Sequence, residues 1–367
     1  MSLNRRELLT ASAVLLAGPG FALRAAGRAA ADAGGGPIVL CWNENPYGPS
    51  PAARAAVSEA IATSCRYPDD DLEPLVKMLA AREGVGSDCI VTGTGSGELL
   101  RALGLIAARD GGEIIAAEPT FLELTDYGHR NGATPRFVPV DARKRLDLAA
   151  MHAAVSSRTR LIYVCNPNNP TSTAVPAADI RAFVAALPAH VTTLVDEAYL
   201  DFVTAPEVSS VVDLVQGKQR VVVTRTFSKI HGMAGIRCGY AIARPDLAQE
   251  LAAARMTTPN TFAVHAARAS LTDQAFLTDT RRRILASRVR ITTELTRLGR
   301  AYAEPQGNFV YFDTGMPLKR FTELMRARNI LVGRRFPPFE NWCRITIGTE
   351  PEVDAFLTAL PAVLKRA

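Results

Sequence analysis

The sequence predicts an α/β protein: a large domain with a mainly parallel sheet covered by helices, plus a smaller α+β domain built from both chain ends. From about Cys89 onward, short apolar runs alternate with helical patterns, which is typical of a parallel sheet covered on both faces. The chain has 367 residues, of which 48% are hydrophobic, and a chain of this length normally divides into two domains. We therefore assign the residues on either side of the alternating region to the second domain.

The apolar runs of the alternating region are the candidate strands. They are Cys89–Thr92, Glu113–Ala117, Leu161–Cys165, Thr192–Asp196, Val221–Thr224 and Arg237–Ala243. Helices are expected between them, for example at Gly97–Arg109 and at Ala177–Leu187, with Pro176 as a first-turn proline. A later helical stretch, Ala275–Leu298, is dense in arginine and is most simply a solvated face.

The domain boundaries follow from this pattern. Residues 1–36 are expected to form an export signal and flexible arm, and 37–67 the amino-terminal arm and part of the small domain. Residues 68–257 are expected to form the large domain, and 258–367 the small carboxy-terminal domain.

The first residues have the order of features expected of a twin-arginine export signal. Arg5 and Arg6 precede an apolar run from Leu8 to Leu23, and small residues follow it. The alternatives are an amphipathic helix with a flexible arm, or a membrane anchor. Glycine and proline at 18–20 interrupt the run, which is shorter than the roughly 20 residues that a span needs, so no stable membrane insertion is expected. We expect periplasmic localisation through this signal, and a cytoplasmic one otherwise.

Composition argues against two classes of function. The formal net charge is +6, but no long Lys/Arg run forms the basic stripe that a nucleic-acid surface needs. The 6 cysteines lie far apart, without a CxxC pair or zinc-like Cys/His spacing, so no metal site is expected. We interpret them as small buried apolar residues. A disulfide becomes feasible if the protein is periplasmic, but the sequence does not indicate a pair.

Lys229 is the first candidate for chemistry. It follows the hydroxyl residue Ser228 near the end of a β-run and precedes a stretch that contains Gly232 and Gly235. A chain of this kind can approach a phosphorylated ring closely while it presents one amine. Taken alone, such a lysine is more often a surface residue.

Asp196 ends an apolar strand, and open α/β sheets bind ligands outside the carboxyl ends of their strands. A carboxylate beside a protonated pyridine nitrogen keeps the ring an electron sink, which carbanion chemistry at an amino-acid α-carbon requires. In isolation Asp196 is equally well explained as a helix N-cap.

Two loops complete the pattern. Pro167 and Pro170 fix the backbone after the strand that ends at Cys165, so that the Asn169 amide could donate to a phenolate oxygen; the alternative is a turn without a ligand. The stretch from Gly93 to Glu98 lies between a strand and a helix, where backbone N–H groups can bind phosphate. It lacks the third glycine of a dinucleotide fingerprint and a Walker lysine.

Taken together, in this order and spacing, these segments resemble the fold-type I pyridoxal-phosphate (PLP) aminotransferases of class I/II, most closely the histidinol-phosphate aminotransferase family. The resemblance runs from about Leu40 to the end of the chain. The matching stretches are NENPYGPSP from Asn43, RYPD from Arg66, NPNNPT from Asn166, VDEAY from Val195, TFSK from Thr226 and RITIG from Arg344. Ser172 departs from the pattern, because the family usually has glycine there.

The resemblance implies a large PLP-binding domain and catalytic roles for three residues. Lys229 would hold PLP as an imine and move a proton between the substrate α-carbon and the cofactor. Asp196 would pair with the pyridine nitrogen. Tyr199 and Asn169 would bond the phenolic oxygen, and Phe121 would stack on the ring.

The resemblance also implies how the phosphate and the substrate are bound. The phosphate contacts would come from Ser96, Gly97, Thr226, Ser228 and Arg237, with Tyr67 reaching it from a partner subunit. A homodimer with shared active sites is therefore implied. Arg344 would form a bidentate clamp on the substrate carboxylate, although on its own it could be a surface ion pair. Asn45 and Tyr47 would line the substrate pocket. Arg334 could bind a phosphate-bearing substrate or be a solvated charge.

The leading hypothesis is PLP-dependent transamination between an L-amino acid and a 2-oxo acid, the donor being histidinol phosphate, an aromatic amino acid or another amino acid. One alternative is a PLP-dependent decarboxylase of the threonine-phosphate decarboxylase type. The other is a non-catalytic ligand-binding protein, against which the full set of candidate residues argues.

Overall fold

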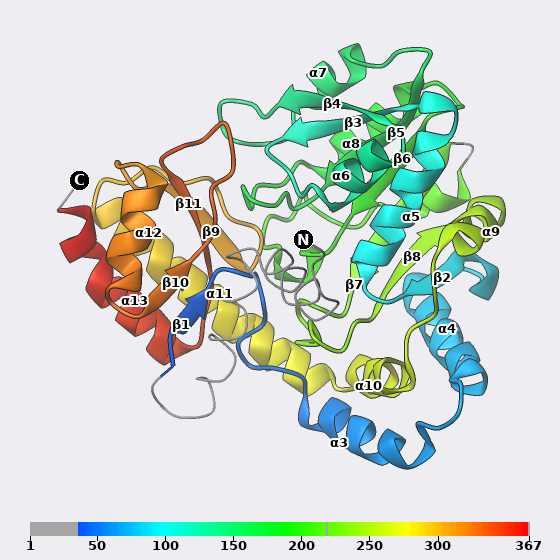
Figure 1. Cartoon of the computed structure of the whole chain (residues 1–367), viewed down its shortest axis with the longest axis horizontal. Coiled ribbons are helices and arrows are strands. Elements are labelled where there is room, and N and C mark those ends of the chain that lie inside the picture. Colours follow the sequence, from blue (N-terminus) through cyan, green and yellow to red (C-terminus); the bar gives the residue numbers. More distant parts are fainter. Residues whose placement is uncertain (1–35, 218, 366–367) are drawn as a thin grey trace, which may run out of the picture.

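The computed structural model describes residues 36–217 and 219–365. Its main feature is a seven-stranded sheet with the strand order β2-β8-β7-β6-β5-β3-β4 (Figure 1). The strands are β2 (Ile90–Gly93), β3 (Glu113–Glu118), β4 (Thr134–Pro139), β5 (Thr159–Cys165), β6 (Thr192–Asp196), β7 (Arg220–Thr226) and β8 (Gly239–Ala243). β3 to β7 are parallel, whereas β8 runs antiparallel to both of its neighbours.

The predicted fold class is confirmed, with differences at the edges of the sheet. β4 was not predicted because most of its residues are exposed, as befits an edge strand, so it lacks an apolar run. β8 begins at Gly239, two residues later than expected, because Arg237 has a φ of 70° and cannot continue a strand.

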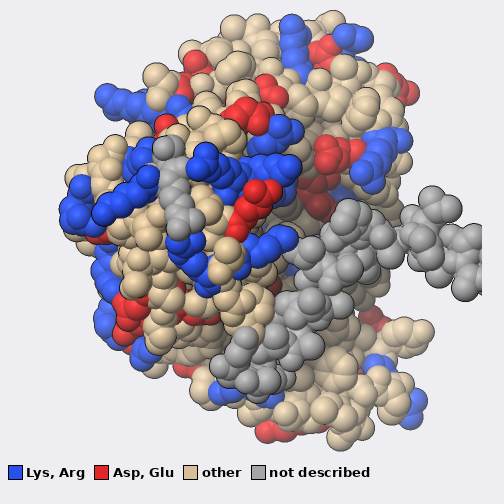
Figure 2. Space-filling model, turned by 60° about the vertical axis from the view of Figure 1, so that its left-hand side comes forward, with Lys and Arg blue, Asp and Glu red and all other residues tan. Residues whose placement is uncertain are grey.

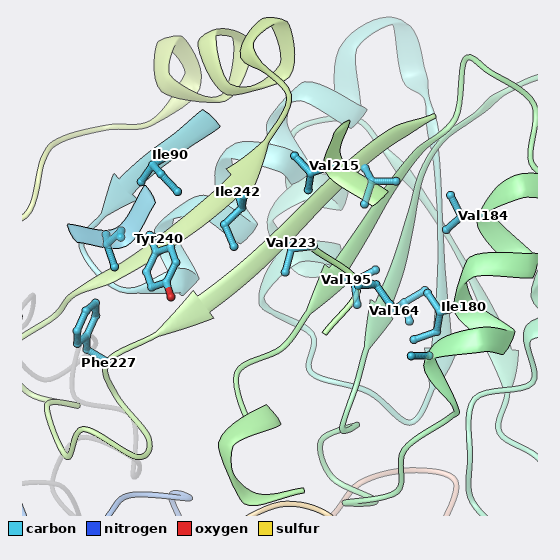
Figure 3. Packing of buried hydrophobic residues seen from close by; sticks show 14 of the residues in the cluster. Ile90, Val164, Ile180, Val184, Val195, Val215, Val223, Phe227, Tyr240 and Ile242 are labelled. Atoms are coloured by element: carbon cyan, nitrogen blue, oxygen red, sulfur yellow. The ribbon is translucent and has the colours of Figure 1, made fainter. Parts of the chain in front are cut away.

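Helices cover both faces of this sheet. One face carries α5 (Ser96–Ala108), α6 (Glu123–Arg130) and α9 (Pro245–Ala254). The other face carries α4 (Asp69–Glu83), α7 (Leu148–Ala153), α8 (Ala177–Ala186) and α10 (Thr261–Thr272), and α3 (Pro51–Ala60) packs on α10. Figure 3 shows Val164 and Val195 of the sheet facing Ile180 of α8. Successive residues of each strand thus pack into two separate cores, one on each face of the sheet.

A third core, separate from the two beside the large sheet, contains both ends of the described chain. β1 (Ile38–Leu40) pairs in parallel with β10 (Ile330–Val332), and β9 (Phe309–Asp313) pairs antiparallel with β11 (Trp342–Thr346). The helices α11 (Gln274–Arg297), α12 (Leu318–Arg326) and α13 (Glu350–Leu364) contribute to this core. This core combines helices and strands, as expected for a small α+β unit. The domain boundaries given above stay a prediction.

The remaining short helices are single 3₁₀ turns. They are η1 (Ile61–Thr63), η2 (Ser87–Cys89), η3 (Arg109–Gly111), η4 (Leu200–Phe202) and η5 (Val212–Gln216). Between residues 36 and 365, position 218 excepted, no helix is long and apolar enough to cross a membrane. The predicted export signal lies outside the described residues, apart from Gly36.

The arginine-rich helix α11 is only partly the solvated face that its composition predicts. Arg282 pairs with Asp279 at the surface, but Arg288 is buried and donates to the carbonyls of Phe202 (2.9 Å) and Gly307 (3.2 Å). Burial lowers the pKa of Arg288 to about 10.

Figure 2 brings forward the side of the molecule with α12 and α13, where acidic side chains lie among basic ones.

Two smaller expectations were wrong. Pro176 is the N-cap of α8 and not a first-turn residue; its φ of −57° and ψ of 144° are extended. Cys65 is exposed, although the cysteines were expected to be buried, because it lies in the turn after η1. Cys41 is half-buried, and the other four cysteines are buried as expected.

Candidate active site

The candidate residues meet at the carboxyl edge of the large sheet. β5, β6 and β7 are parallel neighbours, and in their register Cys165 lies beside Asp196, which lies beside Thr224. The segments that follow these strands, with Asn169, Tyr199 and Lys229, therefore leave the sheet at the same edge. This is where open α/β sheets bind ligands.

Asp196 is buried and is held by its strand neighbours. The Tyr163 hydroxyl on β5 donates to its Oδ2 (3.0 Å), and the Thr224 hydroxyl on β7 donates to its Oδ1 (3.1 Å). Burial raises the pKa of Asp196, and the two hydroxyl donors act against this rise. The side chain is not a helix N-cap. It is a fixed, desolvated carboxyl group of the kind that suits a cationic ring nitrogen.

Lys229 is half-buried, and its Nζ donates to the backbone carbonyl of Asn43 (2.9 Å). Nζ also lies 5.3 Å from the centre of the Tyr199 ring. Burial, followed by the nearby Arg344 charge, lowers the pKa of the amine to about 8. A lysine with this pKa is neutral in an appreciable fraction near neutral pH, as a nucleophilic amine requires.

Tyr199 and Asn169 lie together beside Lys229. Both are buried, and the Asn169 Nδ2 donates to the Tyr199 hydroxyl over 3.4 Å. The Tyr199 ring packs edge-on against Phe309 of β9, with 4.9 Å between the ring centres. Burial raises the pKa of Tyr199, so the phenol keeps its proton and remains a hydrogen-bond donor.

The start of α5 forms an open cradle of backbone N–H groups. Gly95 is the N-cap, with a φ of 83°, and a Cβ there would lie 2.2 Å from a guanidinium nitrogen of Arg237. A Cβ on Gly239 would lie 2.3 Å from the Ser96 nitrogen. The first helical N–H groups, including those of Ser96 and Gly97, have no acceptor within the helix and carry its positive dipole end. Such a cradle suits a phosphate.

Of the predicted side-chain partners of the phosphate, Arg237 lies at this cradle. Arg237 is exposed and donates to the Thr94 carbonyl (3.2 Å), and its contact with the Ser228 Oγ is 3.4 Å. The Thr226 Oγ1 accepts from the Ser228 backbone N–H (3.1 Å). Arg237 thus links Ser228 of the β7–β8 connection to the segment before α5, and Thr226, the last residue of β7, contacts Ser228.

Arg344 is buried on β11 and is not a surface ion pair. Its Nη1 donates to the Asn169 Oδ1 (2.7 Å), and its Nη2 donates to the Cys41 carbonyl. Its Nε is buried without a hydrogen-bond partner, and no carboxylate among the residues that the structure describes lies within 4.0 Å of its guanidinium. A desolvated guanidinium with an unused donor is suited to a substrate carboxylate.

The amino-terminal arm crosses the site between these groups. Asn45 is buried and donates to the Ile230 carbonyl (2.8 Å), and its Oδ1 accepts from the Tyr47 backbone N–H (3.0 Å). The Tyr47 hydroxyl is buried without a partner, and its ring lies 5.3 Å from the Arg283 guanidinium. The arm is therefore attached directly to the residue that follows Lys229.

The remaining candidates make no hydrogen bond with this cluster, although Arg334 shares the Phe336 ring with Arg344, whose guanidinium lies 5.0 Å from the ring centre. Phe121 is half-buried, and the loop before it is tied to the 166–171 loop because Thr120 donates to Asn168 (2.8 Å). Arg334 is exposed, and its guanidinium lies 4.4 Å from the centre of the Phe336 ring. Tyr67 is 91% exposed and has no place in the site of its own chain.

Sequence reasoning missed Asn43, Thr346 and Tyr163. Asn43 lies in the turn-rich arm, but its φ of 55°, which aims its side chain at Tyr199, is not readable from the sequence. Thr346 follows Arg344 by two residues on a strand, and this spacing places both side chains on one face. That signal could have identified Thr346. Tyr163 lies within an apolar run that reads as core.

These residues fit pyridoxal phosphate, which the structure does not contain. The α5 cradle leaves no room for a Cβ at Gly95 or Gly239, as expected where a phosphate approaches the backbone. Asp196 supplies a buried carboxyl group, and Lys229 supplies an amine with a lowered pKa. The donor set thus matches a ring nitrogen, a phosphate and an aldehyde carbon.

Comparison with known proteins agrees with this geometry. The family described as aminotransferase class I and II matches residues 36–360. A histidinol-phosphate aminotransferase of Moorella thermoacetica is 36% identical over 331 residues, covering 89% of this chain and 85% of that protein. An aromatic amino acid aminotransferase of Rhodococcus jostii is 38% identical over 323 residues, covering 88% of this chain and 89% of that protein.

The crystal structure of histidinol-phosphate aminotransferase from Sinorhizobium meliloti in complex with pyridoxal-5'-phosphate matches with a TM-score of 0.85 and 28% identity. The match covers 96% of this chain and 95% of that chain. These findings confirm the predicted resemblance, the enzyme class and the PLP cofactor. The chain belongs to the aminotransferase class I and II family of PLP-dependent enzymes.

Proposed function

We propose that this enzyme transfers the amine of an L-amino acid to a 2-oxo acid, and that Lys229 and Arg344 act on the same substrate molecule. The observation that supports this most directly is the link between them. Arg344 donates to Asn169, Asn169 donates to Tyr199, and Lys229 lies over the Tyr199 ring. A substrate carboxylate on Arg344 would thus bring its α-carbon toward the Lys229 amine.

Different residues of the site are proposed to bind different parts of PLP. Asp196 would hold the ring nitrogen, Asn169 and Tyr199 would hold the phenolic oxygen, and Phe121 would cover a ring face. An ion pair between Asp196 and a protonated ring nitrogen is worth about 4 kcal/mol at ~4 Å and an effective dielectric of ~20, before desolvation. Bound PLP supplies an electron sink for the substrate α-carbon. The phosphate is held by Ser96, Gly97, Thr226, Ser228 and Arg237.

Lys229 has a second task besides holding the cofactor. When it is not bonded to the cofactor, the Lys229 amine would take the proton from the substrate α-carbon and deliver it to the former aldehyde carbon of the cofactor. The lowered pKa of about 8 suits this task, because a general base works best when its pKa lies near the working pH.

The donor is proposed to be an aromatic amino acid or histidinol phosphate, the substrates named for the relatives that are 38% and 36% identical. Histidinol phosphate is not an amino acid, and its phosphate group would take the place of the carboxylate on Arg344. Arg334 distinguishes the two, because it is exposed beside Phe336 and could take a phosphate but has no role for an uncharged aromatic ring. Arg334→Ala should raise KM for histidinol phosphate and leave KM for phenylalanine unchanged. Arg335→Ala, at a neighbouring exposed arginine paired with Glu340, is the control.

The test of the reaction follows both products. Incubation of an aromatic amino acid with 2-oxoglutarate should give a new 2-oxo acid and glutamate in equal amounts. Histidinol phosphate, which has no carboxyl group, should instead give a ketone that keeps the phosphate ester, again with an equal amount of glutamate. Stoichiometric carbon dioxide, released without any need for a 2-oxo acid, would instead indicate a decarboxylase. Absence of turnover with every donor, although PLP is bound, would refute transamination.

We further propose a homodimer in which Tyr67 completes the site of the partner. The exposure of Tyr67, of Ile61 (62%) and of Met256 (69%) supports the presence of apolar side chains available for a contact between subunits. Such large apolar side chains are commonly buried between subunits.

We also propose twin-arginine export to the periplasm, on the basis of Arg5 and Arg6 and the apolar run after them. Replacement of both arginines by lysine should retain the enzyme in the cytoplasm. Unchanged recovery from the periplasm, compared with an Arg24→Lys control, would contradict the proposal.

A further inference from the structure

Two asparagine side chains from distant parts of the chain donate to one hydroxyl group. The Asn43 Nδ2 lies 3.1 Å from the Tyr199 oxygen, and the Asn169 Nδ2 lies 3.4 Å from it. Asn43 belongs to the amino-terminal arm, whereas Asn169 belongs to the loop after β5. All three residues are buried, so water does not replace these contacts.

Both amides are oriented by β11. The Thr346 Oγ1 donates to the Asn43 Oδ1 (3.2 Å) and accepts from the Asn43 backbone N–H (2.8 Å). The Arg344 Nη1 donates to the Asn169 Oδ1 (2.7 Å). Because each amide oxygen already accepts from β11, each amide nitrogen must point toward Tyr199.

This arrangement fixes the direction of the Tyr199 proton. A phenol has two acceptor lone pairs and one O–H donor, and here the two amide nitrogens occupy the lone pairs. The O–H group is therefore directed away from the asparagines, and Asn43 keeps this constraint on Tyr199 when Asn169 turns toward the cofactor. In the proposed function the acceptor of this O–H group is the phenolic oxygen of PLP.

The two asparagines do not have equal roles. Asn169 is expected to turn toward the cofactor oxygen, and its partner Arg344 is expected to turn toward the substrate carboxylate. The Asn43 side chain has no such second task, although the Asn43 carbonyl accepts from the Lys229 Nζ (2.9 Å), and its contact with Tyr199 is the shorter one. Its φ of 55° is tolerated by asparagine and serves to direct this side chain.

We propose that Asn43 is a positioning residue, which keeps the Tyr199 hydroxyl directed at the cofactor and links it through Thr346 to the strand that carries Arg344. This proposal rests on the proposed function. The phenolic oxygen of PLP carries more negative charge when the Lys229-bound nitrogen is unprotonated. A well-aimed Tyr199 donor therefore favours the unprotonated form, and loss of its alignment should favour the protonated form.

The experiment is a pH titration of the visible absorbance of the PLP-loaded enzyme. Asn43→Gly removes the amide but keeps a residue that accepts positive φ. It should raise the pH midpoint for protonation of the Lys229-bound nitrogen by about half to one pH unit, which is the equivalent of one neutral hydrogen bond. Thr346→Val leaves Asn43 in place but removes its orienting hydroxyl, and should give a smaller shift of the same sign. Asn329→Gly is the matched control, because Asn329 is exposed and has a φ of 62°.

The charged groups that face Lys229 and Tyr199 are unchanged in these variants. They are Arg344 from β11, Glu44 from the arm, Asp196 from β6 and Arg237 from the β7–β8 connection. A shift in Asn43→Gly therefore reports the amide and not a lost charge. Asn43→Asp, which accepts the Tyr199 proton and adds a negative charge, should raise the midpoint further.

The outcomes separate the inference from the function on which it rests. A wild-type titration together with unchanged midpoints in Asn43→Gly and Thr346→Val would overturn the role of Asn43 and leave the proposed function intact. A shift in the Asn329 control equal to that in Asn43→Gly would also overturn it. A wild-type enzyme without a visible band would overturn both.

Discussion

The reactivity of Lys229 depends on two neighbouring features, burial and the Arg344 charge. Both destabilise the ammonium form, so the pKa of the amine falls to about 8. Below that pH the amine is mostly protonated and cannot attack a carbonyl carbon. Above it the amine is mostly neutral. The environment of one side chain thus sets the pH range in which the enzyme can take up its cofactor.

We expect the rate of PLP attachment to cofactor-free enzyme to rise with pH and to level off above about 8. Arg344→Gln removes a nearby positive charge and should raise the pH at which the attachment rate is half of its maximum. The measurement is the growth of visible absorbance after mixing with PLP at a series of pH values. Arg335→Gln, at an exposed arginine, should leave the midpoint in place. A wild-type midpoint near 10.5, the ordinary lysine value, would contradict this account.

At the residue scale, sequence patterns predicted side chains whose chemistry is unusual and missed those whose role is orientation. Lys229 and Asp196 stand out because each follows an apolar run. Asn43 and Thr346 are ordinary polar residues, and only the backbone geometry brings them to Tyr199. The roles of the individual site residues remain predictions until variants are measured.

Among the elements, the junction of α5 and β8 builds the cradle that we propose for the phosphate. Glu98 of α5 accepts from the backbone N–H of Thr94 (2.6 Å), Met256 (2.9 Å) and Thr257 (2.8 Å), which fixes the first turn of the helix. Gly239 brings β8 against that turn, because its missing side chain leaves room for Ser96.

Gly239→Ala should weaken PLP binding, because its Cβ would lie 2.3 Å from the Ser96 nitrogen and displace the cradle. Overpacking of this kind costs about 1–3 kcal/mol, or roughly 5- to 150-fold in affinity if it falls on the phosphate turn. Equilibrium titration of cofactor-free enzyme with PLP measures the effect. Gly86→Ala, where the new Cβ meets only the exposed Asp88 side chain, is the control. Equal affinity in both variants would show that the turn does not bind the phosphate.

The sequence predicted elements well where burial gives a strong pattern. β5, β6 and β7 lie in the centre of the sheet and read as apolar runs. β4 is an exposed edge strand without such a run, and Arg288 of α11 is buried because it satisfies backbone carbonyls of the chain beside it. Neither feature has a local signal.

For the whole molecule, the meeting of the two chain ends is a long-range property. Ile38 pairs with Ile330, and no local periodicity encodes a contact over that separation. The sequence predicted that both ends of the chain belong to one smaller unit, and the core there contains residues from both. The residues that pair between β1 and β10, and the register of that pairing, came only from the structure.

The proposed shared active sites can be tested by complementation. Lys229→Ala and Tyr67→Ala subunits should each be weakly active alone. Mixed dimers would contain one site with both residues intact, so that co-expression should restore activity above the average of the two variants. The same experiment with Lys229→Ala and Asp196→Ala, which lie in one chain's site, should restore nothing. Equal activities in the two mixtures would contradict a contribution of Tyr67 across the dimer.

The central claim is that Lys229 holds PLP and passes an amine through it, and its most direct test is the visible absorbance of the purified enzyme while single donors are added. The account predicts a visible band that disappears with histidinol phosphate or an aromatic amino acid and returns when a 2-oxo acid follows. Lys229→Ala should lack that cycle. A wild-type band that no donor alters, or full turnover by Lys229→Ala, would contradict the account.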